Sequence, residues 1–282
     1  MRQVLLNVES IGLIVRSHFV FLTLAFVLPF AIGPWWANKL DGISKWATLR
    51  ALVPCILGAA AGGHILYTMT SPDLATAVPG GMPWTQLYAA GSIFGVLVVA
   101  PFAFLLAGIH PGRMADALMP ISGICVAVAR MGCFLNGCCF GIRCSRFWCL
   151  SYPPDAGPAK HHAKAKLIAY GDWSLPVHPL PLYFAAVGLL ITGVSLWLLP
   201  RRSYRGQVAL VALVIFCVGT YFIEPLRENM FLFRPYWGSE PQHEVLARYL
   251  VWISVGALLT CEIGHRLLRL VPHRSAPSSA AS

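Results

Sequence analysis

Residues 177–199 read VHPLPLYFAAVGLLITGVSLWLL and contain no Asp, Glu, Lys or Arg. A helix of about 20 apolar residues spans the hydrocarbon core of a bilayer, so this stretch predicts a transmembrane helix. A short basic segment follows, and a second apolar stretch, QVALVALVIFCVGTYFIE, occupies residues 207–224. The two stretches predict two consecutive membrane spans.

Five more apolar stretches of similar length lie outside this pair. Together they give seven candidate spans, at residues 11–33, 51–69, 84–108, 117–136, 177–199, 207–224 and 246–264. Backbone groups in hydrocarbon must satisfy their own hydrogen bonds, which helices do. The sequence therefore predicts an all-α fold, a polytopic transmembrane helical bundle of about seven spans.

The composition of the chain excludes an ordinary soluble domain, because 57% of its residues are hydrophobic and only 11% are charged. We expect residues 1–272 to form a single integral membrane domain and the Ser- and Ala-rich tail 273–282 to be disordered. The first span is expected to be retained rather than cleaved, because only Arg2 precedes it and no small-residue cleavage site follows. The connections after Asn136 and after Glu224 are the longest and are candidate functional loops.

The net charge of +10 would suggest a nucleic-acid partner in a soluble protein, but here the basic residues lie mainly in the connections. We therefore expect no nucleic acid, and we interpret these charges as topology signals. Connection 70–83 has no Lys or Arg, whereas connections 34–50 and 200–206 and the tail are basic. This alternation predicts an N-terminus outside and a cytoplasmic C-terminus, although the outer connection after Asn136 is itself basic.

Few polar side chains lie within or beside the spans. A charge at mid-bilayer costs roughly 2.5–3.5 kcal/mol on insertion scales, so each needs a partner or a function. Most are expected at one face of the membrane, and they are Arg16, His18, His64, Arg130, Asn136, His178, Glu224, Arg227 and Glu228. Structural alternatives stay open, since arginines can reach head groups and Glu224 can neutralise Arg227 three residues later.

Arg130 is the hardest of these residues to explain by structure alone. No acidic residue lies within a turn of it in its own span, so its charge must be met by another helix or by an anionic ligand. A guanidinium matches phosphate through paired hydrogen bonds. Arg130 and Arg227 therefore predict a site for the head group of an anionic lipid.

The longest local pattern surrounds Arg130. DALMP at 116–120 is followed, after nine residues, by RMGCFLNGCCFG at 130–141. This pattern resembles the signature of the prolipoprotein diacylglyceryl transferase family, in which Asp-x-x-x-Pro precedes Arg-x-Gly-Asn-Phe-x-Asn-Gly-Glu-x-x-Gly. Further matches keep the family's order along the chain, namely IGLIVRSH at 11–18, GGHILY at 62–67, GSIFG at 91–95, HPLPLY at 178–183 and FIEPLRE at 222–228.

The resemblance implies transfer of diacylglyceryl from phosphatidylglycerol, or another anionic phospholipid, to a cysteine thiol of a preprolipoprotein signal peptide. It also implies a bacterial inner-membrane enzyme, and no cofactor is expected. In that reaction His178 would be the general base, with a pKa lowered by the helix that begins there. Arg130 and Arg227 would stabilise the departing phosphate. The implied substrate-binding residues are Asn136, Glu224, Tyr67, Tyr183 and His64.

The chain departs from the family pattern at several polar positions. Cys133 and Cys138 stand where the signature has Asn and Glu. Ala90 replaces a histidine, whereas His64 and Thr220 replace arginines. These departures leave open a changed acceptor, a changed lipid or the loss of catalysis.

Five of the nine cysteines fall between residues 133 and 149. Their spacing matches neither a zinc ribbon nor a Cys-x-x-Cys redox motif, so no metal is expected, although His161 and His162 could complete a site. In an oxidising compartment disulfides are the better interpretation. Cys144 and Cys149 are predicted to be oxidised, together or with Cys138 or Cys139.

Two other classes of function stay open beside the transferase. The same bundle could carry a thiol-redox or metal-binding membrane protein, because a fold does not determine a function. It could also belong to a non-catalytic lipid-binding relative. A transfer assay separates the first class from the other two.

Overall fold

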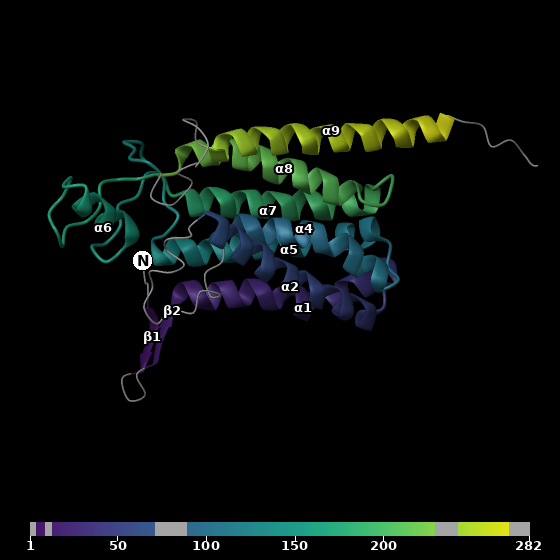
Figure 1. The fold of residues 1–282 in the computed structure, drawn as a ribbon, viewed down its shortest axis with the longest axis horizontal. Coiled ribbons are helices and arrows are strands. Elements are labelled where there is room, and N and C mark those ends of the chain that lie inside the picture. The colour runs from purple at the N-terminus through teal and green to yellow at the C-terminus, as the bar shows by residue number, and fades with distance from the viewer. Residues whose placement is uncertain (1–3, 9–12, 71–88, 229–241, 271–282) are drawn as a thin grey trace, which may run out of the picture.

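The computed structural model describes residues 4–8, 13–70, 89–228 and 242–270. Seven long helices run side by side through this part of the chain (Figure 1), and they are α1 (Ser17–Asp41), α2 (Lys45–Thr70), α4 (Ala89–Leu106), α5 (Pro111–Asn136), α7 (Leu180–Leu198), α8 (Gln207–Ile223) and α9 (Gln242–Leu270). Among the described residues, α1, α2, α5, α7 and α8 are long and apolar enough to cross a bilayer. The predicted all-α bundle is confirmed, and the chain is a multi-pass membrane protein.

The helix α5, which carries the signature segment, lies at the centre of the bundle. It packs against α1 and α7 along much of its length, and α8 and α9 continue the layer on the far side of α7 (Figure 1). The helices α2 and α4 form a separate tight pair, in which a Cβ on Gly62 or Gly95 would collide with a carbonyl oxygen of the partner helix. Small residues at such crossings let membrane helices approach closely.

One end of the bundle carries the smaller elements (left in Figure 1). They are the antiparallel hairpin of β1 (Val4–Val8) with β2 (Leu13–Arg16) and the short helix α6 (Gly157–Lys164). The 3₁₀ turn η4 (Glu224–Leu226), which closes α8, lies at this end too. The amino end of α1, the carboxyl end of α5 and the amino end of α7 meet here. Most of the polar residues singled out above therefore gather at this one end, as predicted.

The predicted start of the first span is wrong. Residues 13–16 form the strand β2 rather than the start of a helix, which begins only at Ser17. The run Leu13-Ile14-Val15 suits a pleated strand better than a helix, because β-branched side chains pack well on that surface. Its pairing with β1 satisfies the backbone hydrogen-bonding groups that helix formation would otherwise satisfy.

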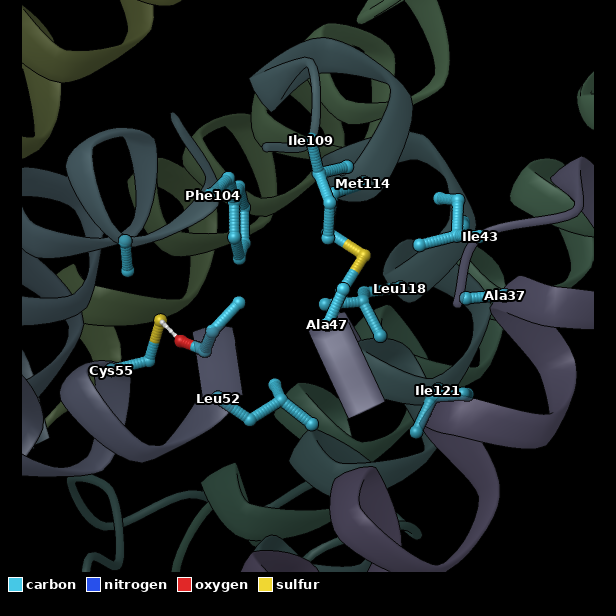
Figure 2. Packing of buried hydrophobic residues seen from close by; sticks show 13 residues of the cluster. Ala37, Ile43, Ala47, Leu52, Cys55, Phe104, Ile109, Met114, Leu118 and Ile121 are labelled. Atoms are coloured by element: carbon cyan, nitrogen blue, oxygen red, sulfur yellow. Dashed lines mark hydrogen bonds between the residues drawn. The ribbon is translucent and has the colours of Figure 1, made fainter. Parts of the chain in front are cut away.

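The predicted end of the first span is also wrong, because α1 continues through Pro34 to Asp41. Proline normally ends or kinks a helix, but here the apolar face continues beyond it, and Trp36 and Leu40 pack on the main hydrophobic cluster. The turn into α2 is therefore only three residues long, with Gly42 at a φ of 64°. Figure 2 shows this cluster, in which Met114 of α5 lies among Ile109, Leu118 and Ala47.

Charged residues join α5 to the turns that follow α1 and α7 at the opposite end of the bundle. The buried carboxylate of Asp116 accepts hydrogen bonds from the backbone N–H groups of Gly206 (2.8 Å) and Ala209 (3.0 Å), at the start of α8. Arg202 lies between Asp116, at 3.5 Å, and Asp41. This network, absent from the sequence-based prediction, holds the turns that follow α1 and α7 against α5.

Some predictions concern segments that the structure does not describe. The disordered tail 273–282 and most of the connection after Glu224 lie outside the described residues. So do residues 71–83 of the connection 70–83 and the side chain of Tyr67. The predicted seventh span, 246–264, lies within α9.

Candidate functional site

Three segments far apart in sequence meet at the end of the bundle that carries α6. The backbone N–H of Gly141, at the end of the signature, donates to the carbonyl of His178 (2.9 Å). The next residue, Ile142, donates to the carbonyl of Leu226 (2.8 Å) and accepts from the N–H of His178 (3.1 Å). The signature is thereby fixed between the start of α7 and the end of α8.

Gly141 is at the tightest point of this junction. A Cβ there would lie 2.5 Å from the carbonyl oxygen of Leu226 and 2.7 Å from the Cβ of His178. Real Cβ atoms do not approach other atoms this closely, so only glycine lets the three segments meet.

The two predicted arginines converge on one aromatic ring. The guanidinium carbon of Arg130 lies 4.4 Å from the centre of the Phe184 ring, and that of Arg227 lies 5.9 Å from it. Phe184, in α7, is buried. Cations over an aromatic face are stabilised by its quadrupole. Sequence reasoning missed Phe184, because nothing distinguishes it from the other apolar residues of its span.

The two arginines differ in whether a carboxylate neutralises their charge. Arg227 forms two hydrogen bonds with the carboxylate of Glu224, at 2.6 and 3.1 Å, so these two residues do neutralise each other. No carboxylate pairs with Arg130 among the described residues. No carboxylate of the described residues therefore neutralises the charge of Arg130 next to Phe184, which suits an anionic ligand.

His178 and Tyr183 form the wall of a cavity of about 360 Å³ that Trp148 and Leu226 also line. The Nδ1 atom of His178 lies 3.1 Å from the hydroxyl oxygen of Tyr183. Burial lowers the pKa of His178, which precedes α7 by two residues and lies outside it. The direction agrees with the sequence-based prediction, and its cause here is desolvation by burial. The imidazole is therefore neutral at neutral pH and can accept a proton.

A disulfide joins Cys144 and Cys149 in the connection between α5 and α7. This confirms the predicted pairing of these two cysteines. Their sulfur atoms and a ring nitrogen of His178 all lie within 4.8 Å of one another. The disulfide therefore borders the residue proposed as the base.

The predicted histidines of this connection have other partners. His161 lies 3.4 Å from a carboxylate oxygen of Glu228. His162 is buried, and its Nδ1 accepts a hydrogen bond from the N–H of Leu175 at 3.2 Å. Neither completes a site with the cysteines, and both instead fix the loop around α6.

The remaining cysteines of the signature form a group of three thiols. Side-chain hydrogen bonds link Cys133, Cys138 and Cys139, none of which is in a disulfide. These bonds hold the pKa of the Cys139 thiol below its usual value, and the charges of Arg130 and Arg227 act in the same direction. The thiols thus border the arginine site.

The structure does not join the other predicted residues to this site. Asn136 ends α5 at the same end of the bundle, but the structure shows no side-chain hydrogen bond for it among the described residues. His64 lies near the carboxyl end of α2, and its Nδ1 is buried without a hydrogen-bond partner in the part of the chain that the structure describes. Their proposed roles in substrate binding stay predictions.

We expect iodoacetamide to leave Cys144 and Cys149 unmodified in the native protein when no reductant is present, because both sulfurs are in a disulfide. Peptide mass mapping with and without reductant checks this result. The reduced sample, in which both cysteines should be labelled, is the control for reagent access. Labelling of both loop cysteines without reductant would contradict the disulfide and would reverse the expected orientation of the loop.

The comparisons with known proteins concern the family of the chain. The family model for prolipoprotein diacylglyceryl transferase matches residues 4–262. The phosphatidylglycerol–prolipoprotein diacylglyceryl transferase 2 of Clostridium perfringens is 20% identical over 229 residues, 79% of this chain and 80% of its own length. The corresponding enzyme of Chromohalobacter salexigens is 27% identical over 255 residues, 84% and 81% of the two chains. The enzyme of Neisseria meningitidis serogroup B is 28% identical over 190 residues, which cover 61% of this chain and 62% of its own length. The chain belongs to the prolipoprotein diacylglyceryl transferase family.

Proposed function

We propose that this protein transfers a diacylglyceryl group from phosphatidylglycerol, or a similar anionic phospholipid, to the cysteine thiol of a lipoprotein signal peptide. The observation that carries the proposal is the convergence of the Arg130 and Arg227 guanidinium groups over Phe184, close to the cavity at His178. The two arginines suit a phosphate group. The cavity at His178 suits a thiol that must lose its proton. The names of the relatives indicate the same substrates.

His178 acts as the base in this reaction. Its Nδ1 interacts with Tyr183, which leaves Nε2 to take the proton of the acceptor thiol. The thiolate then attacks the glycerol carbon that bears the phosphate. A carbon–sulfur bond forms, and the bond from that carbon to the phosphate oxygen breaks.

Arg130 and Arg227 act on the leaving group, glycerol phosphate, which departs with the bonding electrons and gains negative charge. Guanidinium groups hold such a phosphate through paired hydrogen bonds, and they act most strongly where water is excluded. Glu224 positions Arg227 through its two hydrogen bonds. The proton on His178 neutralises the product phosphate or leaves to water.

We further propose that the protein lies in the bacterial inner membrane with its N-terminus outside and its C-terminus cytoplasmic. The end with Asp41, Arg113 and Arg202 then faces the cytoplasm, as the positive-inside rule requires. The site and the disulfide-bearing loop then face the oxidising side, where acceptor signal peptides emerge.

The test is transfer of radiolabelled diacylglyceryl from phosphatidylglycerol to a signal peptide by the purified protein. The expected result is a labelled peptide with a thioether at its cysteine, and no label on the same peptide with serine at that position. Retention of lipid without any transfer would identify a non-catalytic relative and would overturn the proposal.

Replacing His178 with glutamine is expected to lower the transfer rate by about 10²–10⁴-fold, the usual contribution of a positioned general base. Because the pKa of His178 is lowered, the wild-type rate should fall only as the pH drops below neutrality. Raising the pH should not rescue the variant, since it lacks the proton acceptor. Initial rates across pH, with His110→Gln as a control at an exposed histidine of the opposite end, check this result. A His178→Gln rate close to that of the wild type would assign His178 a purely structural role.

A further inference from the structure

The imidazole of His18 lies beside two thiols of the signature segment. The ligand atoms of His18, Cys133 and Cys138 all lie within 4.8 Å of one another, and all three residues are half-buried. His18 comes from the start of α1, whereas the cysteines come from the end of α5 and the residues just after it. Sequence spacing could not reveal this group, because more than 100 residues separate His18 from Cys133.

In the described part of the chain, the side chains of this group show no hydrogen bond or disulfide to residues outside the signature. The Nδ1 of His18 is buried and has no hydrogen-bond partner among the described residues. Both cysteines are free thiols. Apart from its bonds to the neighbouring thiols, the Cys138 thiol makes a long contact, 3.6 Å, to the carbonyl oxygen of Cys133. An imidazole nitrogen without a hydrogen-bond partner and two free thiols are available to bind a ligand.

The donors and their separation suit a thiophilic metal ion. Zinc binds thiolates at about 2.3 Å and imidazole at about 2.0–2.1 Å, which places tetrahedral ligand atoms roughly 3.5–4 Å apart. Small side-chain rotations bring the three atoms to that spacing. The thiol of Cys139, which is hydrogen-bonded to both other thiols, is a candidate fourth donor.

Charge and packing support the same assignment. Two thiolates neutralise a divalent ion, so the occupied site adds no positive charge beside Arg130, which interacts electrostatically with Cys133. The backbones of α1 and α5 are held close at Gly132, where a Cβ would lie 2.7 Å from the Cβ of Phe21. The separation of the backbones at His18 and Cys133 is thus fixed by helix packing, whereas Cys138 lies in the turn directly after α5.

We propose that His18, Cys133 and Cys138 form a binding site for a thiophilic metal ion, with Zn²⁺ as the probe. The site goes beyond the proposed lipid transfer, which uses no metal. The bound ion joins the start of α1 to the turn after α5 and so fixes the segment that precedes Gly141. In this chain a metal site occupies the positions where the family signature has Asn and Glu.

The proposal is tested on the full-length protein, purified in detergent without chelators and then loaded with Zn²⁺ or Co²⁺. The expected result is one ion per chain and, with Co²⁺, the near-ultraviolet absorption of thiolate-to-metal charge transfer. Cys133→Ser, Cys138→Ser and His18→Ala should each weaken binding beyond the roughly 10–100-fold that loss of a supporting partner causes. Cys125→Ser, which removes a free thiol of α5 outside the group, should bind like the wild type.

Two results would overturn the proposal. One is equal metal binding by the wild type and by a Cys133→Ser/Cys138→Ser double variant that elutes as the same folded species. The other is a native disulfide between Cys133 and Cys138, found by mass mapping. Neither result depends on lipid transfer, so a failed transfer assay leaves this test intact.

Discussion

Replacing Arg130 with lysine is expected to reduce lipid transfer by about 10²–10³-fold or more, which is the usual cost of removing one preorganised group that stabilises transition-state charge. Lysine keeps the positive charge but offers a single ammonium in place of the planar guanidinium. It cannot form paired hydrogen bonds to a phosphate, and it loses the stacked contact with Phe184. Arg130→Ala should be at least as inactive.

The measurement is the initial rate of transfer from radiolabelled phosphatidylglycerol, normalised to the amount of protein in the membrane. We expect the loss mainly in kcat, because the phosphate gains charge as the bond breaks. Arg146→Lys is the matched control, since Arg146 is an exposed arginine of the loop after α5. An Arg130→Lys protein with the rate of the control would remove Arg130 from the mechanism. The charge of Arg130 would then interact only with the neighbouring thiols.

Replacing Asp116 with alanine is expected to destabilise the fold by about 3–5 kcal/mol, the range for breaking a buried charge pair. The variant leaves the N–H groups of Gly206 and Ala209 without their acceptor, and it leaves Arg202 with only Asp41. Asp116→Asn keeps the volume and one acceptor oxygen, so its cost should be smaller, about 1–3 kcal/mol.

Thermal unfolding in detergent checks this prediction, with Asp155→Ala as the control at a carboxylate in the loop around α6. The control should change stability by less than about 0.5 kcal/mol. Because Asp116 lies at the end of the bundle opposite the arginines, transfer per folded molecule should not change. A large loss of transfer at unchanged stability would give Asp116 a role in the reaction.

The sequence predicted the bundle well because the bilayer imposes a strong physical constraint. Apolar stretches of sufficient length must be helical in hydrocarbon, and polar residues must lie near the ends of the spans. This constraint alone is enough to group Arg130, His178 and Arg227 at one end of the bundle. The pairing of Glu224 with Arg227 could also be anticipated, because residues three apart share a helix face.

The features that the sequence did not reveal depend on contacts between distant segments. Phe184 is one apolar residue among many in its span, and only the fold places it beneath two arginines. The extension of α1 past Pro34 follows from packing, which local propensity does not contain. The proximity of His18 to Cys133 requires the contact between α1 and α5.

The junction at Gly141 has a consequence for biosynthesis. Its hydrogen bonds connect the end of α5, the start of α7 and the end of α8, which leave the ribosome one after another. Chains elongate at about 5–20 residues per second, so Arg130 and His178 are in the membrane for seconds before Arg227 arrives. During that interval a nascent chain has the base but lacks half of the anion site. The complete pair of arginines is therefore available to a head group only after α8 has been inserted.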